Sequence, residues 1–386
     1  MNTTYIVLRD RSSEIRGSTL AQGAAVEGPA FDLRVAPLEP QQANELNQQE
    51  NVTVAPSMPM SLIKPFGDPT ALAQAVAAGP TWGVQAVRAH TSPFTGKGVV
   101  AAVLDTGIDP NHPAFAGIEL VRRNFTTGGD DDVHGHGTHC AGTFFGQDVD
   151  GVRIGVARGI RRALIGKVLG PGGGSSSDIA KAVQWAAQEG AHVISMSLGV
   201  DFPGYVAELI ADGYPPEQAT SVALQGYRQN VQLFERLASL LRADGNPTIL
   251  VAAAGNESRR TDPKPFTVEV APPAIAEGVI SVAALGKSPA GHTVAEFSNT
   301  GALVSGPGVD IVSARVGGGL TSMSGTSMAT PHVAGVAALW AESLRKQHLL
   351  KPTQFEARII TSVSMNGVVA GADPFDVGGG MIIAPQ

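Results

Sequence analysis

The sequence predicts an α/β protein with a doubly wound, mostly parallel β-sheet, and two patterns lead to this class. After about residue 97, near-continuous apolar runs of strand length recur, and they read GVVAAVLD, ALIGKVL, HVISMSLG, TILVAAAGN and GVISVAAL. Strands buried on both faces of a parallel sheet have this composition. Between the second and third runs, SDIAKAVQWAAQEG has the spacing of an amphipathic helix, so strand and helix alternate as right-handed crossovers require.

Residues 1–70 have a different pattern and predict a small α+β segment. TYIVLRD, FDLRVAPLE and NVTVAPSM have strand composition, and PQQANELNQQE reads as a short polar helix. Gly- and Ser-containing sequence separates the first two strands. Because a segment of this size builds little core of its own, we expect it to lean on the main domain, residues 71–386.

The helix predicted between the second and third apolar runs has one buried face. Asp178 is placed to cap its N-terminus, and Gly190 is placed to end it. The residues on the apolar face are Ile179, Ala182, Val183 and Ala186.

The stretch SMSGTSMATPHVAGVAALW, residues 322–340, predicts a buried helix entered through a polar turn. From Val316 to Ala341 the chain has no charged residue, which is long enough for a membrane span, but hydrocarbon would not hold the Gly, Ser and Thr of the first half. Pro331 fits best in a first helical turn, so we expect the helix to begin near Ser327. By position alone, Ser327 is either the N-cap of that helix or a reactive group.

Composition indicates a folded protein and narrows its partners. Hydrophobic residues make up 43% of the 386 residues and charged residues 16%, which allows a large core. The formal net charge of −7 argues against nucleic acid or an anionic membrane as the main partner. Cys140 is the only cysteine, so no intrachain disulfide can form. The N-terminus lacks the basic and apolar regions of a signal peptide; we expect a cytoplasmic protein, with secretion as the open alternative.

Two polar residues follow apolar strands, where ligands bind in open α/β sheets. Asp105 ends GVVAAVLD, and Asn256 ends ILVAAAGN. Taken singly, each also fits a turn or cap residue.

The turn DDDVHGHGTHCAG is rich in groups that ligate metals or carry protons. His134, His136, His139 and Cys140 allow a metal site, but their spacing is not that of zinc sites and no second ligand cluster follows. Solvated loop histidines are the simplest alternative. In a third interpretation, His136 starts the small-residue helix GTHCAGTFF and acts as a general base.

Taken together, Asp105, His136 and Ser327 favour a catalytic role over purely structural roles as caps or turn residues. Serine is a poor nucleophile until a neutral imidazole takes its proton, and a carboxylate orients that imidazole and stabilises its charged form. The side-chain amide of Asn256 and the amides at the start of the Ser327 helix could donate hydrogen bonds to a developing oxyanion.

Five blocks of the sequence resemble the signatures of the subtilisin-like serine proteases, in family order, over about residues 80–386. The blocks are VLDTGIDPNHP, HGHGTHCAGT, SMSLG, AAAGN and GTSMATPHVAG. The chain order Asp, His, Ser and an asparagine that stabilises the oxyanion are both typical of that family. The resemblance implies polypeptide substrates, a triad of Asp105, His136 and Ser327, and an oxyanion hole at Asn256.

The resemblance also implies how substrate is held. Ser197, Leu198 and Gly199 would form a strand that pairs with the substrate backbone and one wall of the pocket for the residue before the scissile bond. GPGGG, residues 170–174, would offer a facing edge through Gly172 and Gly173. Residues 1–70 would be a pro-segment that assists folding and inhibits the enzyme, with PMSLIKPFGDP lying along the SMSLG edge as a substrate mimic.

Three features depart from the family pattern. Relatives often hold calcium with an Asp at the position of Ala114, and the loop after the histidine-rich helix, GQDVDGVRIGVARG, has Asp148 and Asp150 but no clean match to a calcium loop. We expect no required cofactor and assign no metal ligands, with calcium binding as the open alternative. Cys140 resembles the thiol of the branch that includes proteinase K, although we favour a small buried hydrophobic residue as its role.

The third departure is a long insertion, residues 200–247, which predicts two helices. The second carries an apolar stripe, expected to pack on the domain or, alternatively, to form a partner surface. The stripe consists of Val231, Phe234, Leu237 and Leu241.

We therefore predict a serine endopeptidase made as a self-processing zymogen. A hydrolase of the other common α/β type is disfavoured because its nucleophile needs G-x-S-x-G, whereas Ser327 lies in GTSMA. The alternative from another class is a catalytically silent peptide-binding or regulatory protein on the same fold.

Overall fold

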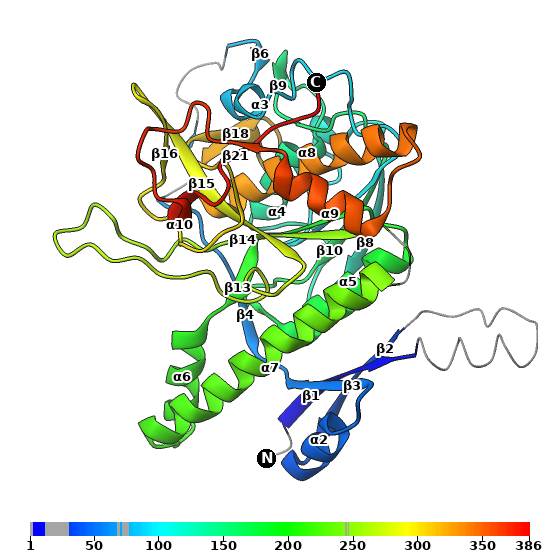
Figure 1. The fold of residues 1–386 in the computed structure, drawn as a ribbon, viewed down its shortest axis with the longest axis vertical. Coiled ribbons are helices and arrows are strands. Elements are labelled where there is room, and N and C mark those ends of the chain that lie inside the picture. The colour runs from blue at the N-terminus through cyan, green and yellow to red at the C-terminus, as the bar shows by residue number, and fades with distance from the viewer. Residues whose placement is uncertain (1–2, 12–30, 68–69, 72–76, 244, 246) are drawn as a thin grey trace, which may run out of the picture.

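The predicted fold class is confirmed by the computed structural model, which describes residues 3–11, 31–67, 70–71, 77–243, 245 and 247–386. A large sheet has the strand order β20–β21–β17–β15–β14–β12–β7–β10–β8, and its central strands are parallel. Figure 1 labels β8, β10, β14 and β15 of this sheet. The strands that match the five apolar runs are β7 (Val100–Asp105), β10 (Arg162–Lys167), β12 (Val193–Met196), β14 (Ile249–Ala253) and β15 (Val279–Ser288).

Helices cover both faces of this sheet, which explains why its central strands are largely apolar. Ala101 and Val103 of β7 belong to the core under α4 (His136–Phe145) and α8 (Thr326–Lys346). Their neighbour Leu104 belongs to the core under α5 (Ser176–Gln188) and α7 (Pro216–Ala243). Successive strand residues point to opposite faces, so every position of β7 needs an apolar partner.

The predicted helix before β12 is present, but its cap differs from the prediction. The N-cap of α5 is Ser175, whose hydroxyl accepts a hydrogen bond from the amide of Asp178. Asp178 therefore lies in the first turn, where a carboxylate still favours the positive end of the helix dipole. Gly190 follows the helix with φ of 82°, as a helix end requires.

The N-terminal segment forms its own antiparallel sheet in the order β2–β1–β3. Its elements are β1 (Thr3–Asp10), β2 (Phe31–Leu38), α2 (Pro40–Asn47) and β3 (Val52–Pro56). The Gly- and Ser-containing sequence between the first two strands falls mostly outside the described residues. Ile6, Leu8 and Phe31 share one hydrophobic core with α5 and α7, so the segment leans on the main domain as predicted.

The insertion forms the two predicted helices, α6 (Phe202–Ala211) and α7, and α7 runs between the large sheet and the N-terminal segment (Figure 1). Phe234 and Leu237 are fully buried, so the stripe packs inside the protein. On the same helix, Asn230 donates a hydrogen bond of 2.9 Å from Nδ2 to the carbonyl oxygen of Pro56, and Arg236 pairs with Asp10. The insertion therefore contacts both the large sheet and the N-terminal segment.

Shorter elements complete the described chain. They are β4 (Pro59–Leu62), β5 (Thr70–Ala71), β6 (Gly79–Pro80), α3 (Trp82–Ala86), η1 (Pro113–Phe115), β8 (Glu119–Asn124), β9 (Val152–Arg153), β11 (Gly174–Ser175), β13 (Leu198–Val200), β16 (Gly291–Val294), β17 (Val304–Pro307), β18 (Ile311–Ala314), β19 (Leu320–Met323), α9 (Pro352–Thr361), β20 (Val363–Ser364), α10 (Pro374–Val377) and β21 (Met381–Ile382). Within the described ranges, we find no helix with the length and apolar character needed to cross a membrane.

Candidate active site

The carboxylate and the imidazole of the predicted triad meet at the carboxyl end of β7. Asp105 is the last residue of β7, and His136 is the first residue of α4. His136 donates from Nδ1 to Asp105, at 2.8 Å from Oδ1 and 3.0 Å from Oδ2. Both side chains are buried. This contact fixes the tautomer of the ring and leaves Nε2 free to accept a proton.

Two opposing effects set the pKa of His136. Burial alone would lower it, since a charged ring is poorly solvated inside the protein. Burial is the largest single effect, but Asp105 and Cys140 together outweigh it and raise the pKa of His136 well above its usual value of 6.5. The pair therefore favours the protonated ring that a general base must become during reaction.

Thr106, a buried residue that the sequence did not single out, links the strand that ends at Asp105 to the helix that begins at His136. The hydroxyl of Thr106 donates to Asp132 at 2.9 Å and accepts from the amide of Gly137 at 2.9 Å. Asp132 also accepts hydrogen bonds from the amide and the hydroxyl of Thr138. The end of β7 is thereby joined to the first turn of α4. No pattern in the acidic run 130–132 separates this buried carboxylate from its exposed neighbours.

Ser327 lies inside the first turn of α8, so the N-cap interpretation is wrong. The helix begins at Thr326 with Gly325 as its N-cap. The Ser327 hydroxyl donates to the carbonyl oxygen of Ile63 at 3.0 Å. Among the described residues, Nε2 of His136 has no hydrogen-bond partner. The serine proton is therefore directed toward the N-terminal segment and away from the imidazole.

Pro331 lies in the second turn of α8 rather than in the first, and this has a consequence for Ser327. Proline has no N–H, so the Ser327 carbonyl loses its usual helical donor four residues on. That carbonyl accepts instead from the hydroxyl of Ser197 at 3.2 Å and from the thiol of Cys140 at 3.4 Å. The hydroxyl of Ser197, a stronger donor than the thiol, thus holds the backbone of Ser327 in place.

The side chain of Asn256, which follows β14, is fixed in one orientation. Its Oδ1 accepts from the amide of Thr326 at 2.9 Å and from the hydroxyl of Thr326 at 2.8 Å. Its Nδ2 must then point the other way, and it donates to the carbonyl oxygen of Lys64 at 2.8 Å. An amide held in this manner is a preorganised donor for negative charge on a carbonyl oxygen.

Residues 59–66, which we call the strap segment, lie across this site. The strap strand β4 pairs antiparallel with β11 on one side and with β13 on the other. Leu198 and Gly199 lie opposite Leu62 and Ser61. Ser197 precedes β13, and its side chain faces Ser327 rather than the strap segment.

The facing edge lies one residue later than predicted. Gly174, not Gly172 or Gly173, opens the strand that pairs with Met60. Gly173 has φ of 84°, and a Cβ there would come within 2.8 Å of the Met60 carbonyl oxygen. A glycine is therefore required at Gly173 so that the strap segment can lie close to the turn.

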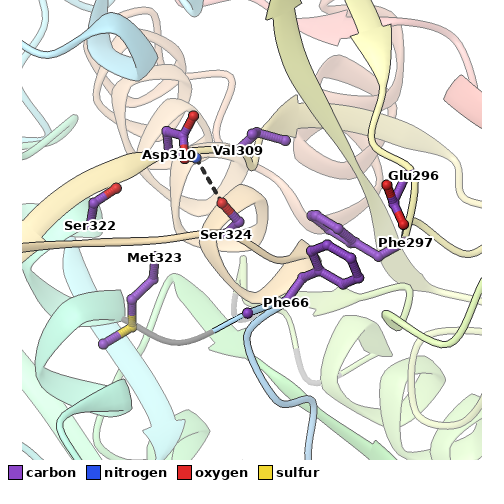
Figure 2. A pocket seen from close by; sticks show the side chains of 9 residues that line it. Phe66, Glu296, Phe297, Val309, Asp310, Ser322, Met323 and Ser324 are labelled. Carbon is purple, nitrogen blue, oxygen red and sulfur yellow. Dashed lines mark hydrogen bonds between the residues drawn. The ribbon is translucent and has the colours of Figure 1, made fainter. Parts of the chain in front are cut away.

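Beyond Lys64 the chain continues along a second strand. The amide of Phe66 donates to the carbonyl oxygen of Ser324 at 2.7 Å, and β5 pairs antiparallel with β19. The ring of Phe66 stacks on Phe297 beside an open pocket (Figure 2). An extended polypeptide thus passes from β11 and β13, past Asn256 and Ser327, to the edge of Ser324.

The histidine-rich turn does not assemble the metal site weighed from its sequence. His134 is exposed, whereas His139 is buried with Nε2 bonded to the carbonyl of Ile311. Burial lowers the pKa of His139 to about 3, so it is not a solvated loop histidine either. Cys140 has Sγ 3.7 Å from Nδ1 of His136, and its ligand atom lies near those of His136 and Asp105 within the site already described.

The two places considered for calcium, Ala114 in η1 and the loop between α4 and β10, do not fit that ion. Ala114 has no ligating side chain, and the carboxylate of Asp148 pairs with Arg158. The buried guanidinium of Arg153 donates to backbone carbonyls, and such oxygens are the ligands a calcium ion would need. The carbonyls belong to Ala89, Gly155 and Val156, at 3.1, 3.3 and 3.3 Å.

The fold and the site define an α/β protein with a carboxylate, an imidazole, a hydroxyl and an amide gathered at the carboxyl ends of parallel strands. Residues 96–378 match the model of the subtilase family, a subtilisin-type peptidase family, and the chain belongs to that family. It is 33% identical over 281 residues to subtilisin-like protease 6 of Trichophyton verrucosum, covering 67% of this chain and 57% of the relative. A subtilisin-like protease of Coccidioides posadasii is 34% identical over 275 residues, with 67% and 58% covered. The chain thus spans somewhat more than half the length of these relatives.

Proposed function

We propose that the chain is a serine endopeptidase that hydrolyses peptide bonds and is made as a self-processing zymogen. The strap segment carries this proposal. It is an extended polypeptide between β11 and β13, and Ser327 and Asn256 hydrogen bond to its adjacent carbonyls, those of Ile63 and Lys64. A polypeptide substrate in the same place would present a carbonyl to both groups.

In the proposed mechanism, Oγ of Ser327 attacks the carbonyl carbon while Nε2 of His136 accepts its proton. The negative oxygen then receives the hydrogen bond of Asn256 and of the amides that begin α8. Asp105 stabilises the imidazolium, which gives its proton to the leaving amine. Water then hydrolyses the acyl-enzyme with the same base, so no cofactor is required.

We propose that Leu198 and Gly199 bind the substrate backbone. The contacts of Ser197 and Gly173 support indirect roles: Ser197 positions Ser327, and Gly173 makes room for the substrate strand. Gly172 lies in the same turn, between Gly170 and Gly173.

We infer self-inhibition from the peptide bond that lies at the site, Lys64–Pro65. The carbonyl held by Asn256 is followed by Pro65, whose ring fixes the backbone and has no N–H. The Ser327 proton is bonded to Ile63 instead of His136. Both features favour an uncut strap segment. We therefore propose that residues 1–70 inhibit the enzyme and that the chain cuts itself at one or more bonds between about Pro56 and Pro80.

A fluorophosphonate probe together with a peptide library tests the activity. We expect the probe to label the wild-type chain at Ser327 and the library to be cleaved, and Ser327→Ala to lose both. If wild type and the strap variant Phe66→Ala both remain unlabelled and inactive, the peptide-binding alternative replaces the enzyme.

A further inference from the structure

We propose that the enzyme has an aromatic subsite for the second residue after the scissile bond, formed by Phe297 and Arg259. This inference rests on the proposed peptidase function and adds a substrate class to it. The subsite is read from the strap segment, in which Phe66 is the second residue after the carbonyl bound by Asn256.

The ring of Phe66 has two specific partners. Its centroid lies 5.0 Å from that of Phe297, and the two ring planes differ by 28°. The guanidinium carbon of Arg259 lies 5.6 Å from the Phe66 centroid. Stacking and cation–π contacts both favour an aromatic ring over an aliphatic side chain of equal size.

Both partners are held in place independently of Phe66. Phe297 belongs to the main hydrophobic core, and its exposure is 2% with the ring of Phe66 stacked on it. Arg259 donates from Nη1 to the carbonyl oxygens of Asn256 at 2.8 Å and Ser258 at 2.6 Å. Because these bonds fix the guanidinium, little ordering remains when a ring binds. They also attach the subsite to the backbone of Asn256.

The backbone and the pocket agree with a substrate subsite. The Phe66 amide is bonded to the carbonyl of Ser324, three residues before Ser327, so the ring is placed by the same strand edge that holds the chain. Beside the ring lies an open pocket of about 420 Å³, with Val309 and Met323 among its apolar lining and Glu296 and Asp310 among its polar lining (Figure 2). This volume admits rings larger than that of Phe, so we expect Tyr and Trp to be accepted.

The first test uses the full chain and changes the strap segment. Phe66→Ala removes the ring that holds the strap, so we expect roughly tenfold higher kcat/KM toward a quenched peptide, from the sum of the two contacts. Phe66→Trp should stay near wild type. The matched control is Phe375→Ala, which removes another exposed ring far from the strap in sequence and should change nothing.

The second test measures the subsite directly. Three peptides with one scissile bond carry Phe, cyclohexylalanine or Ala at the second position after it, and they are assayed with Phe66→Ala protein. We expect kcat/KM to favour Phe over Ala by roughly tenfold, with cyclohexylalanine between them. Adding Phe297→Leu should reduce the preference for Phe at least threefold, and so should Arg259→Gln.

The outcomes separate the subsite from the peptidase function. Cleavage of all three peptides at equal kcat/KM, or an unchanged preference in both subsite variants, would overturn the subsite while leaving the enzyme. Absence of any cleavage and of fluorophosphonate labelling would instead overturn the proposed function.

Discussion

The side-chain amide of Asn256 and the backbone carbonyl of Lys64 form a hydrogen bond of 2.8 Å. These residues are 192 positions apart in the chain, and the bond forms only because β4 is held between β11 and β13. It places a peptide bond of the protein itself, Lys64–Pro65, where the proposed chemistry would act. The groups around that bond can each be changed separately, by mutation, by pH or by chemical modification.

Loss of any triad member should lower turnover by several orders of magnitude without unfolding the protein, because the three residues act as a unit. We expect this for Ser327→Ala and His136→Ala. Asn256→Ala should cost about 3 kcal/mol of transition-state stabilisation, the value known for this family's oxyanion asparagine. Peptide kinetics measures the loss of turnover, and circular dichroism checks that each variant remains folded. Turnover within tenfold of wild type in Ser327→Ala would exclude the mechanism.

The kcat/KM should rise with pH and reach half its maximum above pH 6.5. His136 must be neutral to accept a proton, and Asp105 raises its pKa against the effect of burial. Burial lowers the pKa of His139 to about 3 and that of His332 to about 4, so neither contributes an inflection near neutrality. A profile that is flat from pH 5 to 9 would exclude His136 as the base.

The raised pKa of His136 also makes the stability of the fold depend on pH. A raised pKa in the folded state means that His136 stabilises the fold fully below pH 6.5 and that this contribution is lost as pH rises through the raised pKa. In the Ser327→Ala background, NMR titration of His136 should give a midpoint above 6.5, and Asp105→Asn should lower it.

A mercurial should inhibit the enzyme through Cys140, although the thiol takes no part in the reaction. Its sulfur lies 3.7 Å from Nδ1 of His136, so a metal on sulfur would displace the imidazole. Burial raises the pKa of the Cys140 thiol, which makes the reaction slow. Cys140→Ala should keep activity and lose the sensitivity. Loss of activity in Cys140→Val, with the fold unchanged, would reveal a direct role for the thiol.

The wild-type chain should shorten itself between about Pro56 and Pro80, and Ser327→Ala should stay at full length. If Pro65 protects the strap segment, Pro65→Ala should add a cut after Lys64 and speed processing. Mass spectrometry of freshly purified protein follows both changes. If wild type stays intact and is fully active, residues 1–70 are a permanent domain and not an inhibitor.

Chelation should leave the loop between α4 and β10 unaffected, because Arg153 already binds two of its carbonyls, those of Gly155 and Val156, as well as that of Ala89. A calcium ion at one hundred times its Kd would add about 2.7 kcal/mol, so its removal would lower the Tm visibly. We expect EDTA to leave the Tm of Ser327→Ala protein unchanged.

Removal of the Arg153 side chain, unlike chelation, should lower the stability of the protein. Arg153→Met leaves buried carbonyls without donors and should cost about 2 kcal/mol. Arg158→Gln, at the partly exposed pair with Asp148, should change stability by less than about 1 kcal/mol. A fall in Tm with EDTA that calcium reverses, together with no effect of Arg153→Met, would contradict this account.

Much of the architecture was predictable because it follows from local patterns. The apolar runs identify the parallel strands, and the order of Asp105, His136 and Ser327 at element ends places them at one edge of the sheet. Ser175 replaced Asp178 as the cap of α5 because both residues can cap and only the backbone decides between them.

Contacts between distant segments were not predictable from the same patterns. Pro331 leaves the Ser327 carbonyl without its helical donor, and Ser197 donates to that carbonyl instead. No local pattern predicts this contact, because it depends on how α8 approaches β13. The register that brings Lys64, rather than a neighbour, to Asn256 is set jointly by β11, β13 and β19. The buried role of Asp132 depends likewise on a contact with Thr106, 26 positions away.

Under the proposed self-inhibition, the core that the N-terminal segment shares with α7 would set how long inhibition lasts after a cut. While the chain is continuous, the strap competes with substrate at a high effective concentration that dilution does not change. Once it is cut, contacts of Ile6 and Leu8 with the core that includes α7 delay its release, and only after it has dissociated does rebinding become bimolecular. Activation should therefore be faster after dilution. A concentrated preparation should stay inactive long after every chain has been cleaved.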